Sequence, residues 1–479
     1  MKKKTTVILL LSMMFVLFAA AGLLIFYLHQ ENLYNNPKIQ ALNEVGLQTF
    51  ADQTDNEVFQ NIPLYAAEGV KVTDPKDRGD NVYMVTVNGT NKTQYEAYLQ
   101  MLEDAGFAFF SDNGEKGIAE SVYTASFTKD DLAVTVTYVA NDETVYLTSS
   151  NKMNLSEHLI YKDEYQANNI DGMKNTLHML ELYDYGNSFV FQLKNGHFIV
   201  SDGGSSNDIR YLIDYLESLT PNGDKPVIEA WFISHAHGDH NGALASLTSD
   251  TDLLQRIYID GIYLSMPNNE ALAAVNATNM MKNMMMIQTL PSFAKASDGS
   301  NTKLYRPQTG QKYYFCDVVI DIMHTQEQLP TEDYANMDLN DSSMWTMFHI
   351  DKQKFMLSGD ADKGSMSIVM RTYPKEYFAM DIYASFHHNL NNWLPFLELC
   401  TVKTTLFTTS GTEPQNKAAG EINGAGANAW LMKKSLDYYS WEDGGKVLTF
   451  PYKVGTAKSL PMQEWIYHAS RERTFSQSK

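Results

Sequence analysis

The sequence predicts an α/β protein in which a small α+β domain precedes a larger domain of mixed strands and helices. An apolar run at residues 227–234 ends directly in four potential metal ligands, as a buried strand does when it delivers side chains into a cleft. A hairpin pattern at 186–204 and a helical pattern at 209–219 come before it, in the order expected of an α/β sheet. The 479 residues, 44% of them hydrophobic, suffice for two or three domains with real cores.

The first 29 residues predict a membrane anchor. Lys2, Lys3 and Lys4 precede an uncharged run at 5–28 that is long enough to cross the hydrocarbon core as a helix. The positive flank stays in the cytoplasm, so we expect a single-pass protein of the cell membrane with its bulk outside the cytoplasm. A cleaved signal peptide is the alternative, but the apolar run continues past the small residues at 19–22. The simple charged start and the lack of a disulfide framework favour a bacterial protein.

Two segments lie between the anchor and the larger domain. Residues 30–80 are polar and interrupted by prolines, which predicts a spacer. Residues 81–150 combine one helical pattern with several alternating strands and predict a small α+β domain. This domain carries no clustered ligands, so we expect a spacer or docking module, with recognition of a wall polymer or a partner as the alternative.

The larger domain is predicted at 175–455, followed by a C-terminal tail at 456–479. After the ligand-bearing stretch, strands and helices alternate. Strands are expected at 256–264, 317–323, 380–386, 404–409 and 446–450, a hairpin at 340–361, and helices at 269–290, 391–397 and 427–436.

The four potential ligands lie within six residues. His235 and His237 are two apart at the strand exit and can converge on one ion, whereas Asp239 and His240 are offset enough to hold a second. Imidazole and carboxylate suit zinc, with manganese and iron as alternatives. Two divalent ions about 3.5–4 Å apart can bridge a water, lower its pKa to about 7 and clamp both oxygens of a displacement. Hydrogen-bonded structural histidines are the alternative, which four ligands at this spacing disfavour.

The pattern H-x-H-x-D-H after a strand resembles the metallo-β-lactamase superfamily, and further motifs follow in that family's order. The hairpin at 186–204 ends in Asp-Gly-Gly, so the resemblance implies that Asp202 orients the metal ligands. The hairpin at 340–361 ends in Ser-Gly-Asp, which implies Asp360 as the bridging carboxylate. A strand then delivers His387 and His388, one of which is expected to close the shell of the second ion.

Within the superfamily, the motifs look most like the hydrolase domain of bacterial DNA-uptake (competence) channel proteins and their free-standing relatives. The resemblance covers roughly 175–455 and implies an αββα sandwich with a dinuclear cleft at one sheet edge. Two positions depart from the pattern. His324 is the only candidate for the histidine that many members place before the bridging aspartate, and Asn389 replaces the glycine after the histidine pair. The first ion is therefore expected to be weakly held, or held by His324 in an unusual way.

The composition excludes some functions and some nucleophiles. A net charge of −20 disfavours non-specific binding of nucleic acid, which requires clusters of lysine and arginine. Glycine-rich phosphate loops and a serine nucleophile elbow are absent from the sequence. Cys316 and Cys400 are expected to be buried free thiols rather than a disulfide, and His197 to lie at the surface. The remaining histidines are expected to be structural: His158, His178, His349 and His468.

The expected function is the hydrolysis of a phosphoester or phosphodiester outside the membrane. Asp360 would bridge two ions, the hydroxide between them would attack phosphorus in line, and Asp239 is placed to accept a proton. The acidic composition favours a cell-wall polymer or a small ester over DNA. A carboxyl or thioester substrate, a nuclease acting with DNA uptake and a catalytically silent, membrane-tethered binding or scaffold protein are the alternatives. The expected metal ligands are His235, His237, Asp239, His240, Asp360, and His387 or His388.

Overall fold

The computed structural model describes most of the two domains. The described residues are 59, 61–79, 81–183, 186–267, 269–275, 277–329, 338–409, 425–441 and 444–461. None of the helices in these ranges has the length and apolar character that a membrane span requires. The predicted anchor at 1–29, much of the predicted spacer, and His468 lie outside the described residues.

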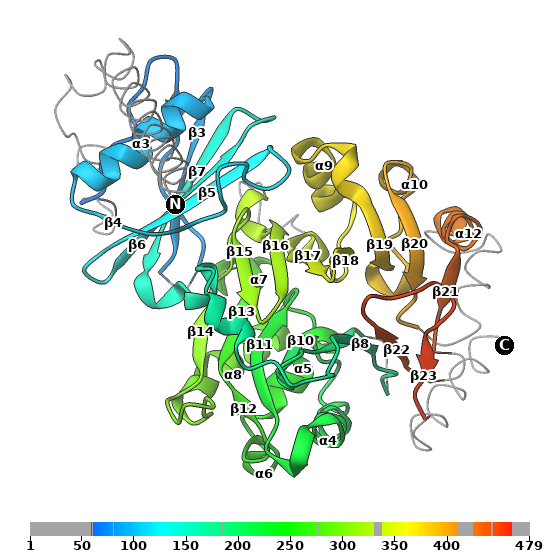
Figure 1. The fold of residues 1–479 in the computed structure, drawn as a ribbon. Coiled ribbons are helices and arrows are strands. Elements are labelled where there is room, and N and C mark those ends of the chain that lie inside the picture. The colour runs from blue at the N-terminus through cyan, green and yellow to red at the C-terminus, as the bar shows by residue number, and fades with distance from the viewer. Residues whose placement is uncertain are drawn as a thin grey trace, which may run out of the picture.

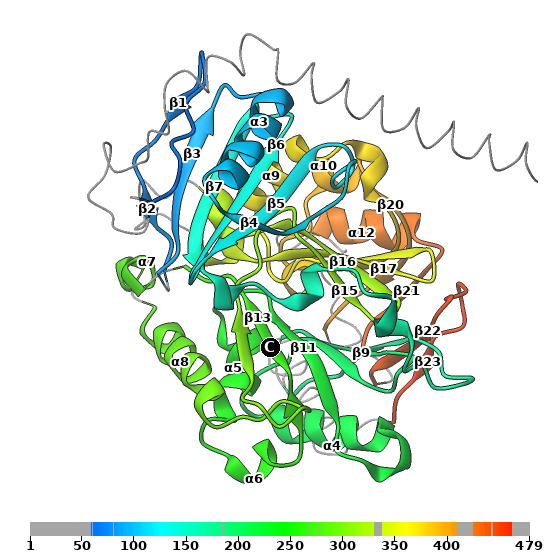
Figure 2. The ribbon, with the colours of Figure 1, turned by 60° about the vertical axis from the view of Figure 1, so that its left-hand side comes forward.

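The small N-terminal domain is an antiparallel sheet crossed by one helix (Figures 1 and 2). Its strands follow the order β1-β3-β7-β6-β5-β4, and β2 also pairs with β3. Asn91 caps the helix: its side chain accepts from the Gln94 N–H, while the Gln94 side chain accepts from the Asn91 N–H. The elements are β1 (Lys71–Val72), β2 (Lys76–Asp77), β3 (Tyr83–Asn88), α3 (Lys92–Asp104), β4 (Ala108–Asp112), β5 (Val122–Lys129), β6 (Leu132–Val139) and β7 (Thr144–Asn151).

The described part of the predicted spacer packs into the core of this domain. Phe59, Ile62 and Tyr65 are buried in the core between the sheet and α3. The Tyr98 hydroxyl of α3 donates to the Pro63 carbonyl at 2.7 Å, which fixes the segment to the helix. Its two strands are two residues long, too short for a period-2 pattern to be recognised in the sequence.

The larger domain is the αββα sandwich that the resemblance implies (Figure 1). One sheet has the order β14-β13-β11-β10-β9-β8-β22-β23, with β12 beside β11, and the other runs from β15 to β21 in sequence order. Aromatic rings fill the space between the sheets; Phe191 stacks on Phe348 with ring centroids 4.2 Å apart. Helices α4, α5, α6 and α8 lie outside the first sheet, and α9, α10 and α12 outside the second (Figure 1).

The first half of the sandwich ends in the strand that carries the ligands. Helix α4 turns Ile209, Leu212 and Leu216 inward at helical spacing, as its sequence predicts. The elements are β8 (Thr176–Met179), β9 (Ser188–Gln192), β10 (Phe198–Asp202), α4 (Ile209–Leu219), β11 (Val227–Ile233), α5 (Gly238–Ser246), α6 (Thr251–Leu254), β12 (Tyr258–Ile259), β13 (Gly261–Leu264), α7 (Asn269–Ala274), α8 (Thr278–Thr289) and β14 (Lys303–Tyr305).

Two elements predicted as continuous are interrupted. The helix at 269–290 is two helices, because the Ala277 N–H closes α7 on the Leu272 carbonyl and α8 then packs against α5. The strand at 256–264 breaks between β12 and β13 at Asp260, whose carboxylate accepts from Ser297. The contact between Asp260 and Ser297 joins residues 37 apart in the sequence, so a local pattern does not reveal it.

The second half of the sandwich carries the bridging aspartate and the histidine pair. Residues 456–461 of the predicted tail are part of the fold, since β23 pairs with β22. The elements are β15 (Lys312–Phe315), β16 (Val318–His324), β17 (Trp345–Ile350), β18 (Gln353–Leu357), α9 (Lys363–Thr372), β19 (Ala379–Ala384), α10 (Leu394–Leu397), β20 (Thr401–Leu406), α12 (Ala425–Lys434), β21 (Asp437–Tyr439), β22 (Lys446–Thr449) and β23 (Lys458–Ser459).

The small domain is docked on the sandwich through the sheet face opposite α3. We call this surface the hydroxyl face; it consists of the buried residues Thr124, Ser126, Thr135, Thr137 and Thr148. The Thr137 hydroxyl donates to the Thr309 carbonyl at 3.1 Å, and the Asn113 amide donates to the Gly310 carbonyl at 2.9 Å. Nearby, the Arg78 guanidinium donates to the Glu327 carbonyl at 2.8 Å. A buried, hydrogen-bonded interface of this kind is a fixed attachment and not a flexible spacer.

Gly310 provides a direct test of this interface. Its φ is +91°, and a Cβ there would lie 2.0 Å from the Thr124 hydroxyl oxygen. Gly310→Ala is expected to destabilise the protein by roughly 1–3 kcal/mol from overpacking, in addition to backbone strain. Gly299→Ala is the matched control, because its φ is +83° and no atom lies within 4 Å of the added carbon. Urea unfolding measures both variants, and equal destabilisation would contradict the docking.

Candidate metal centre

The ligand-bearing loop is held between a strand end and a helix start. Strand β11 ends at Ile233, and α5 begins at Gly238, so that Asp239 and His240 lie in its first turn, where the helix dipole favours a carboxylate. The Asn241 amide donates to the Ala236 carbonyl at 2.9 Å and fixes the loop from inside. His235 and His240 are fully buried.

The predicted ligands converge in two groups that share one carboxylate. The first group is His235, His237 and Asp360, and the second is Asp239, His240, Asp360 and His388. The two oxygens of Asp360 face different groups. Its Oδ2 lies 3.8 Å from His235 Nε2, while its Oδ1 lies 3.0 Å from His240 Nε2 and 3.5 Å from His388 Nε2. The Asp239 carboxylate closes the second group at 3.3 Å from His388 Nε2.

The two groups fit divalent cations. Ligands bonded at 2.0–2.1 Å in a tetrahedral zinc shell lie about 3.3 Å apart, close to the separations within the second group. The Nε2 of His240 and the Oδ1 of Asp360 are buried, yet neither atom completes a hydrogen bond. Such atoms are costly in a protein interior unless they bind something, and a cation between them would satisfy both.

Electrostatics within the cluster favours a bound positive charge. Burial raises the pKa of Asp360, but His240 and His388 outweigh it and hold this pKa well below its usual range. Burial lowers the pKa of His388, but Asp360 and Asp239 outweigh it and raise this pKa to about 9. Without a metal ion, protons on the imidazoles thus balance the negative charge of the carboxylates. An ion would displace these protons, so metal affinity is expected to fall as the pH is lowered.

Each buried ligand imidazole is oriented by a partner on its other nitrogen. The Asp202 Oδ2 lies 2.9 Å from His240 Nδ1, and a carboxylate at this position can orient the ring. Asp202 also accepts from the Ser234 N–H and hydroxyl at 2.8 and 3.0 Å. The Ser234 hydroxyl lies 3.0 Å from His235 Nδ1, and the Thr408 hydroxyl 3.4 Å from His388 Nδ1. Sequence reasoning missed Ser234 and Thr408, because single hydroxyls at strand ends carry no recognisable pattern.

His324 does not join either group. It is fully buried at the end of β16, its Nδ1 lies 2.9 Å from the Gln328 amide oxygen, and its Nε2 lies 3.4 Å from the Asp341 carbonyl. A register shift just before His324 changes its pairing with β17. Because both ring nitrogens already have protein partners, the structure gives no support to a metal-binding role for His324.

The stretch Asn340-Asp341-Ser342-Ser343, at the start of the predicted hairpin, has a structural role. Asp341 accepts from the Ser365 N–H at 2.7 Å and so caps the start of α9. Gly364 is required beside it, because a Cβ would lie 2.2 Å from the Asp341 carboxylate. The motif therefore joins α9 to the loop before β17.

The remaining predicted histidines and cysteines lie outside the cluster. Both cysteines are free and buried, which confirms the expectation. His158 stacks on Phe315, His178 bonds Tyr215, and His349 pairs with Asp321. His197 pairs with Glu229 at 2.7 Å, and its side chain is 37% exposed.

The pair of His197 and Glu229 predicts a pH-dependent stability. Burial lowers the pKa of His197, but Glu229 outweighs it and raises this pKa above its ordinary 6.5; burial raises the pKa of Glu229, but His197 outweighs it and lowers this pKa below 4.5. Between pH 4.5 and 6.5 the pair therefore makes its full contribution to the stability of the folded protein. This contribution is lost as the pH rises through the raised pKa of His197 or falls through the lowered pKa of Glu229. His197→Gln is expected to lower the free energy of unfolding more at about pH 5.5 than at about pH 8.5, with a difference of no more than about 1 kcal/mol because the pair is partly exposed. Urea unfolding at the two pH values measures this difference. Equal losses at both pH values would contradict this.

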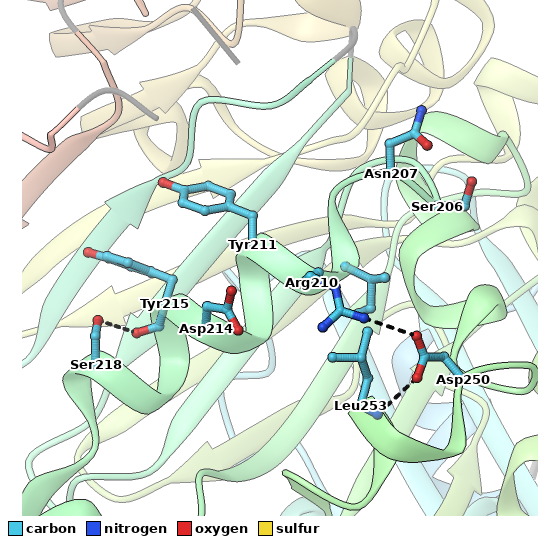
Figure 3. Close-up of a pocket in the computed structure, with 10 residues that line it drawn as sticks. Ser206, Asn207, Arg210, Tyr211, Asp214, Tyr215, Ser218, Asp250 and Leu253 are labelled. Carbon is cyan, nitrogen blue, oxygen red and sulfur yellow. Dashed lines mark hydrogen bonds and ion pairs between the residues drawn. The ribbon is translucent and has the colours of Figure 1, made fainter. Parts of the chain in front are cut away.

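A separate cavity of about 500 Å³ lies along α4, away from the ligand groups (Figure 3). Tyr211 and Tyr215 line it, and Arg210 turns towards Asp250 at 3.6 Å. Arg210 is well exposed, and none of the lining residues belongs to a metal-binding group. We therefore place the candidate site at the histidine and aspartate cluster.

Comparison with known proteins finds similarity only among solved structures. No family model matches the chain, and no curated protein matches it. The metallo-β-lactamase fold protein YhfI from Bacillus subtilis is 12% identical over 56% of this chain and 96% of its own, with a TM-score of 0.34. Zn(2+)-bound PqqB from Methylobacterium extorquens is 12% identical over 50% and 67%, with a TM-score of 0.27. A long form RNase Z from yeast is 8% identical over 60% and 48%, with a TM-score of 0.33.

Similarity at this level transfers neither substrate nor mechanism. The chain's own features are two mixed sheets with helices outside, and two histidine and aspartate groups where a buried strand ends. These features agree with the fold and the ligand cluster that the resemblance of the sequence motifs to the metallo-β-lactamase superfamily implies.

Proposed function

We propose that this protein is a membrane-anchored enzyme that hydrolyses a phosphoester or phosphodiester outside the cytoplasm. It would use two divalent metal ions, and zinc is the metal we favour. The observation that carries the proposal is Asp360, whose two oxygens face two separate ligand groups. Two ions sharing a carboxylate supply an activated water at neutral pH and positive charge for both oxygens of a displacement.

The open side of the cluster indicates where a substrate approaches. His235, His240 and Asp360 are buried, whereas the side chains of Asp239 and His387 are 33% and 24% exposed. Asp239, a member of the second ligand group, therefore lies on the solvent side of that group. The buried residues behind it hold the ligands in place and exclude water from that side.

The charge of the site supports an anionic substrate that depends on the ions. Within the described ranges, no lysine or arginine forms an ion pair with Asp239 or Asp360. Neutralisation of a phosphoryl group would therefore fall to the metal ions. The overall charge of −20 supports a cell-wall polymer or a small ester over nucleic acid, although the motifs resemble the hydrolase domain of DNA-uptake proteins.

The location is part of the proposal and rests on the sequence alone. The uncharged run at 5–28 behind three lysines supports a single-pass anchor with the enzyme outside the cytoplasm. Fractionation of cells that express the full chain, with protease added to intact protoplasts, tests this placement. Protection of the hydrolase domain from the protease would contradict it.

The function is tested by the metal content of the purified full-length protein, measured beside hydrolysis of a bis-aryl phosphodiester. We expect two equivalents of metal, with turnover that chelation abolishes and zinc restores. His235→Ala is expected to lose turnover, and His349→Ala, which lies outside the cluster, to keep it. Absence of metal, together with no turnover of phosphate, carboxyl and thioester probes, would overturn the proposal in favour of a tethered binding protein.

A further inference from the structure

The two ligand groups are unequal in their number of ligands. The second group has two histidines and two carboxylates, whereas the first has His235, His237 and the shared Asp360. The residue that sequence reasoning offered for the first ion, His324, is bound elsewhere. The first group therefore has one protein ligand fewer than the second, unless another residue of the chain supplies it.

His387 lies on the side of Asp360 that faces this first group. Its Nε2 is 3.5 Å from the Asp360 Oδ2, the oxygen that also faces His235. Its neighbour His388 approaches the other oxygen, Oδ1. His387 is also close enough to His237 to affect its charge state. The His387 Nδ1 is buried without a hydrogen-bond partner, so the ring makes its polar contact through Nε2.

The backbone separates the two neighbouring rings by an unusual turn. His387, His388 and Asn389 have φ values of +45°, +48° and +76°, a left-handed conformation that costs about 1–2 kcal/mol for each residue other than glycine. Asparagine tolerates this conformation better than most residues, so Asn389 suits the end of this turn. Strain of this kind persists only where the surrounding structure fixes it, and it gathers at functional sites.

The surroundings do fix this turn. The Ser385 hydroxyl donates to the Asn389 side-chain oxygen at 3.0 Å, and the Asn428 amide donates to the Asn389 carbonyl at 3.0 Å. The Asn392 side chain accepts from the Phe386 N–H at 3.3 Å. The Asn428 and Asn392 contacts hold the backbone of this turn, and the Ser385 contact holds the Asn389 side chain. Together they position the two imidazoles beside Asp360.

We propose that His387 is the third imidazole ligand of the first ion, while His388 serves the second, so that neighbouring residues are divided between two ions. This assignment rests on the metal binding in the proposed function, and it gives the first ion the imidazoles of His235, His237 and His387. It also replaces the expectation of a weakly held first ion.

The test measures metal binding in the absence of substrate. Zinc and cobalt are titrated into metal-free full-length protein against a chromophoric chelator. Wild type is expected to bind two equivalents. His387→Ala is expected to weaken one of them by at least about tenfold, the scale of a lost metal contact, and to shift the cobalt absorption bands. His349→Ala is the control and should bind as wild type does.

Double variants assign the ion. If His387 and His235 share an ion, the double variant His235→Ala/His387→Ala is expected to bind the other ion as tightly as His235→Ala alone does. The double variant His235→Ala/His388→Ala is expected to bind that other ion more weakly. Two unperturbed equivalents in His387→Ala would overturn the assignment and leave His387 as a contact for substrate or a proton. Two equivalents without phosphodiester turnover would refute only the proposed reaction, and no metal in wild type would refute both.

Discussion

Replacing Asp360 with asparagine is expected to abolish the paired binding of metal and to reduce hydrolysis by more than about a hundredfold. The loss should exceed the 10–100-fold effect typical of residues behind the ligands, because Asp360 belongs to both groups. The carboxylate is charged at neutral pH, since His240 and His388 outweigh burial and hold its pKa low. Asparagine keeps the shape but removes this charge and offers one oxygen instead of two.

Metal content by mass spectrometry and the initial rate with a bis-aryl phosphodiester measure this variant. Asp351→Asn is the matched control, because this substitution also exchanges a carboxylate for an amide. Asp351 lies beside Lys194, outside the cluster. The control should retain both ions and the wild-type rate. Two tightly bound ions in Asp360→Asn would show that this carboxylate does not connect the groups.

Asp202→Asn is expected to weaken the second ion by about 10–100-fold, although the residue does not reach the metal position. In wild type the carboxylate accepts from the Ser234 N–H through one oxygen and faces His240 Nδ1 with the other. An amide has only one acceptor. If its oxygen remains with the Ser234 N–H, its NH₂ faces His240, and the imidazole must then carry its proton on Nε2, the atom that faces Asp360.

Turning the amide over does not resolve the conflict, because its NH₂ would then face the Ser234 N–H. The variant should therefore fold with a lower Tm, bind one ion normally and bind the other weakly. Chelator titration and thermal unfolding in excess zinc measure both effects. If Asp202→Asn lowers Tm but leaves the affinity for both metal ions unchanged, Asp202 has only a structural role.

The sequence predicted those features of the fold and the cluster that are encoded locally. The apolar strand before His235, the ends of two hairpins at Asp202 and Asp360, and the spacing of four ligands can all be recognised within a few residues. The structure brings these residues together. The sandwich itself was implied by the resemblance of these motifs to the metallo-β-lactamase superfamily.

What the sequence could not predict depends on backbone angles or on distant partners. His387 faces one particular oxygen of Asp360 because three consecutive residues have left-handed backbone angles. The sequence His-His-Asn does not predict this conformation. His324 seemed a ligand by its position in the order, yet Gln328 and Asp341 bind both its nitrogens. The burial of Phe59 in the small domain likewise arises from a tertiary contact.

The hydroxyl face has a consequence for how the chain is made. Thr137 and its carbonyl partner Thr309 are 172 residues apart in the chain, and Arg78 and Glu327 are 249 apart. At a synthesis rate of about 5–20 residues per second, the loops that cover the hydroxyl face are synthesised roughly 10–50 s after the small domain. An aliphatic surface exposed for that time would invite aggregation, whereas threonine and serine can bind water until the later loops arrive. The polar character of this interface thus lets the first domain stay soluble while the ribosome completes the second.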